Sequence, residues 1–388
     1  MVDNLPKHFL TIAMIFSSIK IASISDVHLG NPRNEAQYII DNLYRAFPRN
    51  AETASLDVLV IAGDFYDRLL TLPQQESHQI DQAIVYLLRL CKDYDIDLWI
   101  VRGTNSHDRD QTLRFVLLNE MYKIGANLVY RDYLDIVWMP KFGINVLFVP
   151  DEWNGNDPDK TLEQVYQEMK IRDISKVDFA VMHGQFEYQL PPVVKAPKHN
   201  SKAYLSIVKY LIFIGHVHIF TTNERIIAQG SFDRISHNEE GPKGHVRAIV
   251  RSEDDYEIEF VENIGARIFK TVNCYDHDLK TCEELILEAA GQVPEFSFLR
   301  VRANAGNPIL QAEKHYTDLC PLLNWTFEPN KDSEKAIQKQ IELQRAEIYI
   351  PVMINPDNIV ELVEDRLSAK ATSQHVFKRA MMRLNELR

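Results

Sequence analysis

The chain has 388 residues, of which 45% are hydrophobic and 25% are charged, as is usual for a folded globular protein. Its formal net charge is −12, whereas proteins that coat nucleic acid non-specifically are usually basic. If DNA is a substrate, a local basic patch, metal ions or a partner subunit must therefore supply the attraction. No apolar run approaches ~18–20 residues, which argues against a membrane-spanning helix.

The N-terminus and the cysteines indicate a cytoplasmic protein. The apolar stretch FLTIAMIF at 9–16 is short, has a single lysine before it and is followed by no A-x-A site, so residues 1–18 are interpreted as an N-terminal extension. The four cysteines form no C-x-x-C pair, which is typical of reduced thiols.

Short apolar runs that end in polar clusters recur along the first 220 residues. They are IKIASIS (19–25), LDVLVIA (56–62), DLWIV (97–101), VDFAVM (177–182) and YLIFI (210–214). Helical patterns lie between these runs, at 35–47, 78–93 and 161–170. Further strand-like runs follow at 225–228, 246–250 and 256–261. Strands that alternate with helices predict an α/β fold, and the later hairpin-like runs predict mixed sheets.

The composition changes near residue 265, which predicts a domain boundary there. Residues 19–265 would form the main domain and 266–330 a small α+β cap domain. Residues 331–388 read as a charged linker followed by amphipathic helices at 355–367 and 373–387. The apolar stripe of the last helix favours docking on a partner protein, and covering the cap domain is the alternative.

Carboxylates and imidazoles follow five of the apolar runs, where the strands are predicted to end. The clusters are Asp26-x-His28, Gly63-Asp64, Asn105-Ser106-His107-Asp108, His183-Gly184 and His216-x-His218. Sites in α/β sheets assemble at the carboxyl ends of strands, and residues two apart in an extended segment point the same way. Mixed nitrogen and oxygen ligands suit Mn, Fe or Zn. The set is too large for one tetrahedral ion and suits two ions ~3.5–4 Å apart, as used in phosphoester hydrolysis.

This series of motifs resembles that of the calcineurin-like metallophosphoesterases over residues 20–218. The segment QGSFDRISHNEEGPKGHVRAIV at 229–250 resembles that of SbcD-type DNA repair nucleases, the bacterial and phage relatives of the meiotic-recombination-eleven nuclease. The resemblance implies a four-layer α/β/β/α sandwich of mixed sheets.

The resemblance also implies two metal ions, most readily Mn, with Mg, Fe or Zn as alternatives. The first ion would have as ligands Asp26, His28, Asp64 and His218. The second ion would share Asp64 and would also bind His183, His216 and a residue of the 105–106 pair.

Three further roles are implied by the resemblance. His107 would donate a proton to the leaving 3′ oxygen or stabilise it. Asp108 would orient the His107 imidazole. Asp67 would lie near the first metal without binding it directly.

The loop around His107 departs from the family pattern Gly-Asn-His-Asp, because two residues are inserted between the glycine and the histidine. Counting back from His107, the position of the asparagine falls on Ser106, whose hydroxyl is a poorer neutral ligand than an amide. Asn105 is one residue away, and both assignments stay open. A weakened second metal is one consequence of this departure.

The function implied is that of a Mn-dependent DNA exonuclease and endonuclease subunit, which would act in DNA repair and recombination with an SbcC-like ATPase and form a homodimer. Arg102 and Arg109, which flank the metal loop, would contact DNA phosphates; ordinary surface charge is the alternative reading. The competing hypotheses are another calcineurin-like phosphodiesterase or phosphatase, and a catalytically weakened subunit that tethers DNA.

Overall fold

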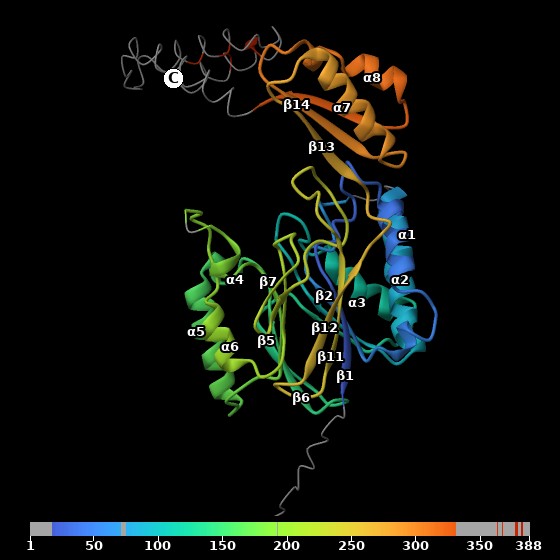
Figure 1. Ribbon diagram of the computed structural model, residues 1–388. Helices are drawn as coiled ribbons and strands as arrows, with labels where there is room; N and C mark the ends of the chain where they lie inside the picture. The colour runs from blue at the N-terminus through green and yellow to red at the C-terminus, as the bar shows by residue number, and fades with distance from the viewer. Residues whose placement is uncertain are drawn as a thin grey trace, which may run out of the picture. The chain divides into compact units, whose positions relative to one another are not determined.

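The computed structural model describes residues 18–70, 75–191 and 193–330, together with Val363, Leu367, Phe377, Lys378 and Met382. The chain divides into two compact units, Met1–Glu328 and Pro329–Arg388. The elements described below belong to the first unit (Figure 1), except that the last strand ends just beyond it. The predicted extension before residue 18 and the predicted C-terminal helices, apart from those five residues, lie outside the described residues.

The main part of the chain holds two six-stranded mixed sheets. The strand order of the first sheet is β12-β11-β1-β2-β3-β4. Its strands are β1 (Ile19–Ile24), β2 (Val58–Ala62), β3 (Asp97–Val101), β4 (Leu128–Arg131), β11 (Gly244–Val250) and β12 (Tyr256–Glu262). Strands β1 to β4 are parallel, whereas β11 pairs antiparallel with both β1 and β12.

The second sheet has the strand order β5-β6-β7-β8-β10-β9. Its strands are β5 (Asp135–Met139), β6 (Ile144–Val149), β7 (Phe179–His183), β8 (Ile212–Gly215), β9 (Thr221–Asn223) and β10 (Ile226–Ala228). The four inner strands are parallel, and the two edge strands β5 and β9 run antiparallel to their neighbours.

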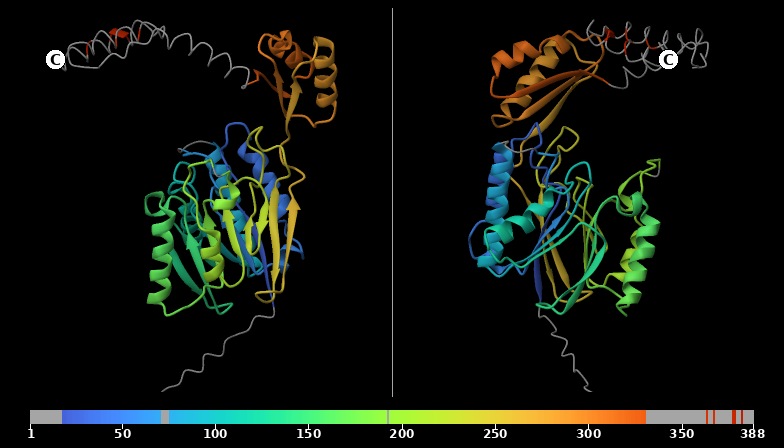
Figure 2. Two further views of the ribbon diagram at one scale, coloured as in Figure 1. Left: turned by 60° about the vertical axis from the view of Figure 1, so that its left-hand side comes forward. Right: turned by 180° about the vertical axis from the view of Figure 1, so that it is seen from behind.

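Helices cover the outer face of each sheet, so the molecule has four layers (Figures 1 and 2). The first sheet is covered by α1 (Ala36–Ala46), α2 (Gln75–Asp93) and α3 (Arg114–Met121). The second is covered by α4 (Trp153–Asn156), α5 (Pro158–Ile171) and α6 (Ser201–Ile207). The predicted α/β fold with mixed sheets is confirmed.

Three apolar cores hold the layers together. One lies between the first sheet and its helices, one between the two sheets, and one between the second sheet and its helices. Strands β2 and β3 are buried at every position and consist almost wholly of apolar residues, as parallel strands covered on both faces must be.

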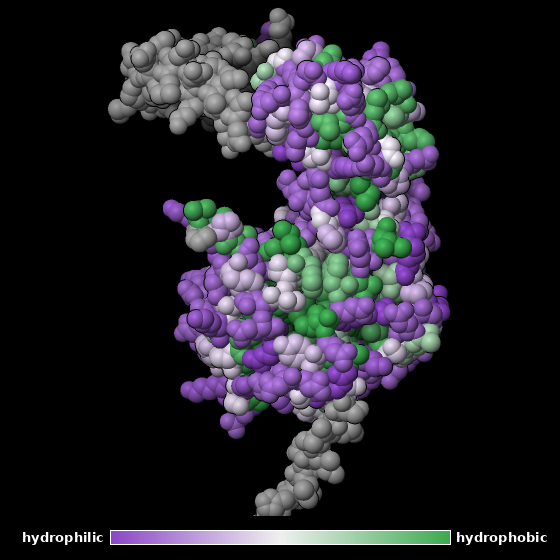
Figure 3. Space-filling view, viewed as in Figure 1, coloured by the Kyte–Doolittle hydropathy of each residue, from purple (hydrophilic) through white to green (hydrophobic). Residues whose placement is uncertain are grey.

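The edge strand β12 shows the contrasting pattern of a half-exposed strand. Its residues Tyr256, Ile258 and Phe260 pack against the core between the sheets, whereas Glu257 and Glu259 are exposed. The hydrophobic area in the middle of the face in Figure 3 lies over β11 and β12, among mostly hydrophilic side chains. Charged residues on an edge strand discourage pairing with another chain.

Residues beyond 265 form a third sheet with a core of its own. Its order is β13 (Phe269–Cys274), β14 (Phe298–Ala303) and β15 (Asn324–Pro329), and α7 (Leu279–Gly291) and α8 (Glu313–Leu319) accompany it. Alternate residues of β14 pack with the apolar face of α7. This is the stretch predicted as a cap domain, although it falls in the same compact unit as the main sheets.

The sheet topology places the predicted site. The loops after β1, β2 and β3 leave the same edge of the first sheet, and those after β7 and β8 leave the corresponding edge of the second. Backbone hydrogen bonds join neighbouring loops: Asp26 N donates to Gly63 O at 3.1 Å, and Gly184 N donates to Gly215 O at 3.2 Å. Among the described residues, no helix is both long and apolar enough to cross a bilayer.

The core between the sheets generates a stability prediction. Trp99 is fully buried there against Phe142 and Phe179, so Trp99→Ala should lower the free energy of unfolding by about 3–5 kcal/mol. Trp138 on β5 is 53% exposed, and Trp138→Ala should change it by less than about 0.5 kcal/mol. Urea unfolding followed by circular dichroism measures both; equal losses would contradict the assignment of the core.

Candidate metal centre

The loops that carry the site have an unusual backbone. Asp26, His28 and Asp64 adopt the left-handed conformation at φ 50°, 52° and 49°, and His216 has φ 102°. Non-glycine residues uncommonly adopt a positive φ, and residues held in such strained conformations tend to cluster at functional sites. Four of the predicted ligands therefore sit on strained turns directly after β1, β2 and β8.

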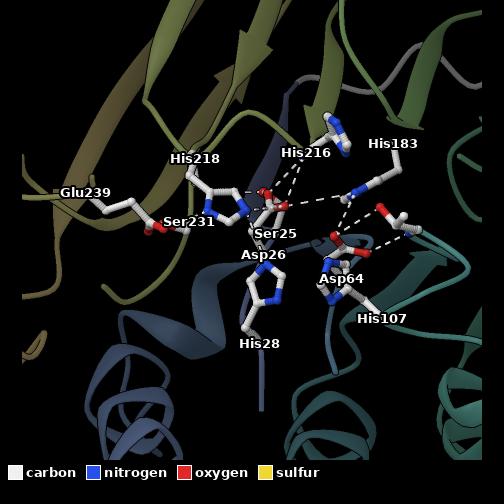
Figure 4. A network of polar contacts seen from close by, with 12 residues as sticks. Ser25, Asp26, His28, Asp64, His107, His183, His216, His218, Ser231 and Glu239 are labelled. Carbon is white, nitrogen blue, oxygen red and sulfur yellow. Dashed lines mark hydrogen bonds and ion pairs between the residues drawn. The ribbon is translucent and has the colours of Figure 1, made fainter. Parts of the chain in front are cut away.

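The first cluster consists of Asp26, His28 and His218. Asp26 is fully buried, and its Oδ1 lies 3.4 Å from His218 Nε2 (Figure 4). The Nε2 atoms of His28 and His218 lie 3.1 Å apart. The three side chains each offer a ligand atom within 4.8 Å of the others. Two ring nitrogens this close, beside a buried carboxylate, require a proton or a cation between them.

His218 is held by a buried ion pair on its far side. Its Nδ1 lies 3.1 Å from Glu239 Oε1, and Glu239 Oε2 accepts from Ser231 Oγ at 3.0 Å and lies 3.2 Å from Lys243 Nζ. Lys243 Nζ also donates to the His218 carbonyl at 2.6 Å. A carboxylate on Nδ1 fixes the ring and leaves Nε2 free to bind a metal.

The second cluster consists of Asp64, His183 and His216, which again offer ligand atoms within 4.8 Å of one another. His183 is fully buried, and its Nδ1 donates to Ala62 O at 2.7 Å. Its Nε2 faces Asp64 Oδ2 at 3.3 Å and has no hydrogen-bond partner among the described residues. This buried, unpartnered nitrogen is in the tautomer that a metal ligand needs.

His107 stands where the two clusters meet. Its Nδ1 lies 2.5 Å from the backbone carbonyl of Asp67, and its ring packs edge-on against His28 at 4.9 Å between centroids. His107, His28 and Asp64 form a third group with ligand atoms within 4.8 Å of one another. With Nδ1 committed to a carbonyl, Nε2 is the nitrogen available for chemistry.

Asp67 lies beside the first cluster, as the sequence led us to expect. Its Oδ1 lies 3.3 Å from His28 Nδ1 and accepts from Asn31 Nδ2 at 2.8 Å. The side chain thus orients His28 in the way that Glu239 orients His218.

Asp108 does not orient His107, which corrects the expectation from the sequence. The Asp108 carboxylate is fully buried and accepts backbone N–H groups of Asp64 at 3.1 Å, Tyr66 at 3.0 Å and Gly103 at 2.8 Å. Burial and the nearby Asp64 carboxylate raise the pKa of Asp108 to about 6. Its contacts clamp the loops after β2 and β3 together, and the Asp67 carbonyl orients His107 instead.

The loop after β3 also differs from expectation. Asn105 and Ser106 are both exposed, and the Asn105 N–H donates to Glu152 Oε2 at 3.2 Å. The residue that reaches the cluster is Thr104, whose N–H donates to Asp64 Oδ1 at 2.6 Å and whose Oγ1 lies 3.2 Å from Asp64 Oδ2. The insertion before His107 bulges outward, so counting back from the histidine points to the wrong residue.

Asp151 joins the site although the sequence reasoning missed it. It follows β6, is 8% exposed, and places Oδ2 at 3.4 Å from His216 Nδ1 and 2.8 Å from Thr104 Oγ1. The signal was present in the sequence: INVLFV at 144–149 is an apolar run that ends in Pro-Asp-Glu, like the other strands of the site.

Two glycines allow the loops to approach this closely. A Cβ on Gly103 would collide with the backbone and carboxylate of Asp64, and a Cβ on Gly63 would collide with the His183 ring. Glycine at position 63 lets His183 of the second sheet approach the loop after β2, and glycine at position 103 lets the loops after β2 and β3 pack against each other.

The charges of the site stabilise one another. Burial raises the pKa of Asp26 and of Asp64, but the surrounding imidazoles outweigh it and hold both pKa values below the usual range. Burial lowers the pKa of His183 and of His218, but the carboxylates outweigh it and raise both, that of His218 to about 10. Without metal the rings hold protons, and a divalent cation can take the place of those protons.

The donor set fits divalent metal. It combines buried carboxylate oxygens with imidazole nitrogens. The outer nitrogens of His183 and His218 contact the Ala62 carbonyl and Glu239, and His183 Nε2 has no hydrogen-bond partner within the described part of the chain. Such N/O sites suit Mn, Fe or Zn.

The raised pKa of His218 predicts how stability depends on pH. An unfolded histidine has a pKa of about 6.5, and that of folded His218 is about 10. Protonated His218 therefore stabilises the fold fully below the unfolded pKa, and this stabilisation is lost as the pH rises towards and through the folded pKa. Chelator-treated protein should melt at progressively lower temperature from pH 7 to pH 10, and Mn²⁺-loaded protein should show less of this decline because a ligating histidine binds no proton.

The matched variants for that measurement are His218→Gln, which should flatten the decline, and His78→Gln, which should not. His78 is exposed on α2 and contacts Gln82. A melting temperature of metal-free wild-type protein that is constant or rises between pH 7 and pH 10 would contradict the assigned contacts of His218.

Two solved structures show a distant similarity to this chain. Among solved structures, the chain resembles GAP50, the anchor in the inner membrane complex of Plasmodium, at 14% identity over 65% of this chain and 87% of that one, with a TM-score of 0.35. Another solved structure, a crystal structure, is 14% identical over 63% of this chain and 100% of that one, with a TM-score of 0.37. No curated protein matches the chain.

Both TM-scores are below 0.5, so the assignment rests on the family model. The model of the calcineurin-like phosphoesterases matches residues 19–220, which contain both Asp/His clusters. This match covers more than half of the sequence. The chain belongs to the family of calcineurin-like, metal-dependent phosphoesterases.

Proposed function

We propose that this protein is a Mn-dependent DNA nuclease that hydrolyses phosphodiester bonds at a two-metal site. The observation that carries the proposal is the position of Asp64. Its carboxylate lies close to His183 and His216, which would bind the second ion, and to His28, which would bind the first, with the His107 ring beside it. A carboxylate shared by two sets of ligands, with a further imidazole at the junction, suits a pair of ions with a proton donor beside them.

The two ions would be held by the residues already described. The first would bind Asp26, His28, Asp64 and His218, and the second would bind Asp64, His183 and His216. When bound, such a pair neutralises the charge of a phosphodiester and activates water for its hydrolysis. Glu239 and Asp67 would keep the rings of His218 and His28 in place through their outer nitrogens.

His107 would supply the proton that the leaving group needs. Its Nδ1–H is held by the Asp67 carbonyl, so a second proton on Nε2 faces the junction of the clusters. As water attacks phosphorus and the bond to the 3′ oxygen breaks, that proton passes to the oxygen. Protonating a leaving alkoxide in this way is general acid catalysis.

DNA as the substrate is supported by the segment 229–250 and by two arginines. The segment resembles that of SbcD-type nucleases, and its Glu239 and Lys243 form the buried pair that holds His218. Arg109 is exposed directly after the catalytic loop, and Arg102 is half-buried before it, with Nε lacking a hydrogen-bond partner among the described residues.

The biological setting proposed is an SbcCD-like complex for DNA end processing in the cytoplasm. The protein would form a homodimer and bind an SbcC-like ATPase through the predicted C-terminal helices at 355–367 and 373–387. A partner that contributes basic surface would also offset the net charge of −12.

Replacing His107 tests the proposed chemistry. His107→Ala should retain both metal ions but lose about 10²–10⁴-fold in kcat on linear and hairpin DNA with Mn²⁺, because it removes the proton donor and no ligand. His78→Ala, a change at an exposed histidine on α2, is the control and should behave as wild type. Metal-loaded wild-type protein that cleaves no DNA, alone or with its ATPase, would refute the proposal, as would a His107→Ala variant of full activity.

The arginines can be tested separately from the chemistry. Arg109→Ala and Arg102→Ala should each weaken DNA binding at low salt and reduce the slope of log K against log salt by about 1, as expected for one lost phosphate contact. Arg89→Ala, on the helix α2, is the control. Fluorescence anisotropy with a labelled duplex in Ca²⁺ measures this, and an unchanged salt slope in both variants would exclude them from the interface.

A further inference from the structure

The second cluster lacks a ligand of the kind that the family pattern supplies. The asparagine of that pattern has no counterpart in the site, because Asn105 and Ser106 are exposed. Thr104 takes the position nearest Asp64, but its side chain is shorter than an amide side chain. The ligands that remain are Asp64, His183 and His216.

Asp151 lies beside this gap with one oxygen fixed and the other directed at the cluster. Its Oδ1 accepts the N–H of Glu152 at 2.9 Å, which anchors the carboxylate to its own loop. Its Oδ2 lies 3.4 Å from His216 Nδ1. Two ligand atoms ~2.1 Å from one ion lie roughly 3.0–3.4 Å apart in octahedral or tetrahedral geometry, so this spacing fits a shared cation.

The Thr104 hydroxyl lies between the carboxylates of Asp64 and Asp151. Its Oγ1 lies 2.8 Å from Asp151 Oδ2 and 3.2 Å from Asp64 Oδ2, but a hydroxyl carries one proton and can satisfy one carboxylate. On the other side of Asp64, the buried Nε2 of His183 has no hydrogen-bond partner within the described part of the chain. Two carboxylates that share one hydroxyl proton, beside two imidazoles, mark a site for a cation.

We propose that Asp151 is a ligand of the second metal ion through Oδ2, in place of the amide of the family pattern, and that Thr104 positions its carboxylate. The inference rests on the proposed two-metal site. The second ion would then have two carboxylates and two imidazoles as ligands, from Asp64, Asp151, His183 and His216. A pocket lined by Thr104, Asp151 and His216 opens beside the carboxylate and gives ions access to it.

An anionic ligand in place of a neutral one changes what the site can bind. It adds a third carboxylate to Asp26 and Asp64, which strengthens the hold on a hard divalent ion and lowers the positive charge that faces the substrate. Oxygen-rich ligand sets favour Mn and Mg over softer metals. The protein therefore keeps a second metal site although the insertion in the loop after β3 removes the asparagine ligand of the family pattern.

Counting bound ions tests this proposal without using activity. Chelator-treated full-length protein is titrated with Mn²⁺ by calorimetry, and wild type should bind two ions. Asp151→Ala should bind the first ion normally and the second more than ~100-fold more weakly. Even the loss of a residue that only contacts a metal ligand typically lowers metal affinity about 10–100-fold. Asp151→Asn should lose less, because an amide oxygen can still coordinate.

Glu152→Gln is the matched control. It removes the same charge from the neighbouring residue, which contacts the Asn105 N–H, and both affinities should stay as in wild type. Melting curves of the metal-free variants check folding; if Asp151→Ala does not fold, Asp151→Asn carries the test.

A spectroscopic measurement separates a ligand from a residue that only holds the His216 ring. With Co²⁺ in both positions, Asp151→Asn should shift the visible absorption bands of the second ion, because a ligand has changed. Unchanged bands, or affinities of Asp151→Ala within about threefold of wild type, would overturn the proposal. Neither readout involves DNA, so a failure of the nuclease assignment would leave this result interpretable.

Discussion

The site depends on the close approach of the two sheets at Asp64. Gly63 leaves room for it, since a side chain there would overlap His183, and Gly103 lets the loop after β3 pack against Asp64. Asp108 then ties the loops after β2 and β3 together through three backbone N–H groups. Ligands from β1 and β2 of one sheet and from β7 and β8 of the other can therefore surround one carboxylate, which no single sheet could achieve.

Contacts to the ring nitrogens that face away from the site orient the histidine ligands. Asp67 holds His28, Glu239 holds His218, and the Ala62 carbonyl holds His183. Each contact occupies one ring nitrogen and directs the other inward, so the imidazoles are oriented before any ion arrives. This preorganisation is what outer partners of metal ligands provide. In the metal-free protein the Asp26 and Glu239 carboxylates raise the pKa of His218, which links metal binding to pH.

The sequence predicted most of this arrangement, and its errors have physical causes. Apolar runs that end in Asp or His identified β1, β2, β3, β7 and β8, because buried parallel strands have a strong local signal. The pair β5 and β6 was missed, and Asp151 with it. The assignments of Asn105, Ser106 and Asp108 went wrong because loop conformation and long-range hydrogen bonds leave little trace in residue spacing.

The proposed chemistry requires two ions that share Asp64. Crystals of the full chain soaked in Mn²⁺ and measured at the manganese absorption edge test it directly. Two ions that share Asp64 should give two anomalous peaks ~3.5–4 Å apart, both in contact with the Asp64 carboxylate. A single peak, or two peaks that do not both contact Asp64, would contradict it.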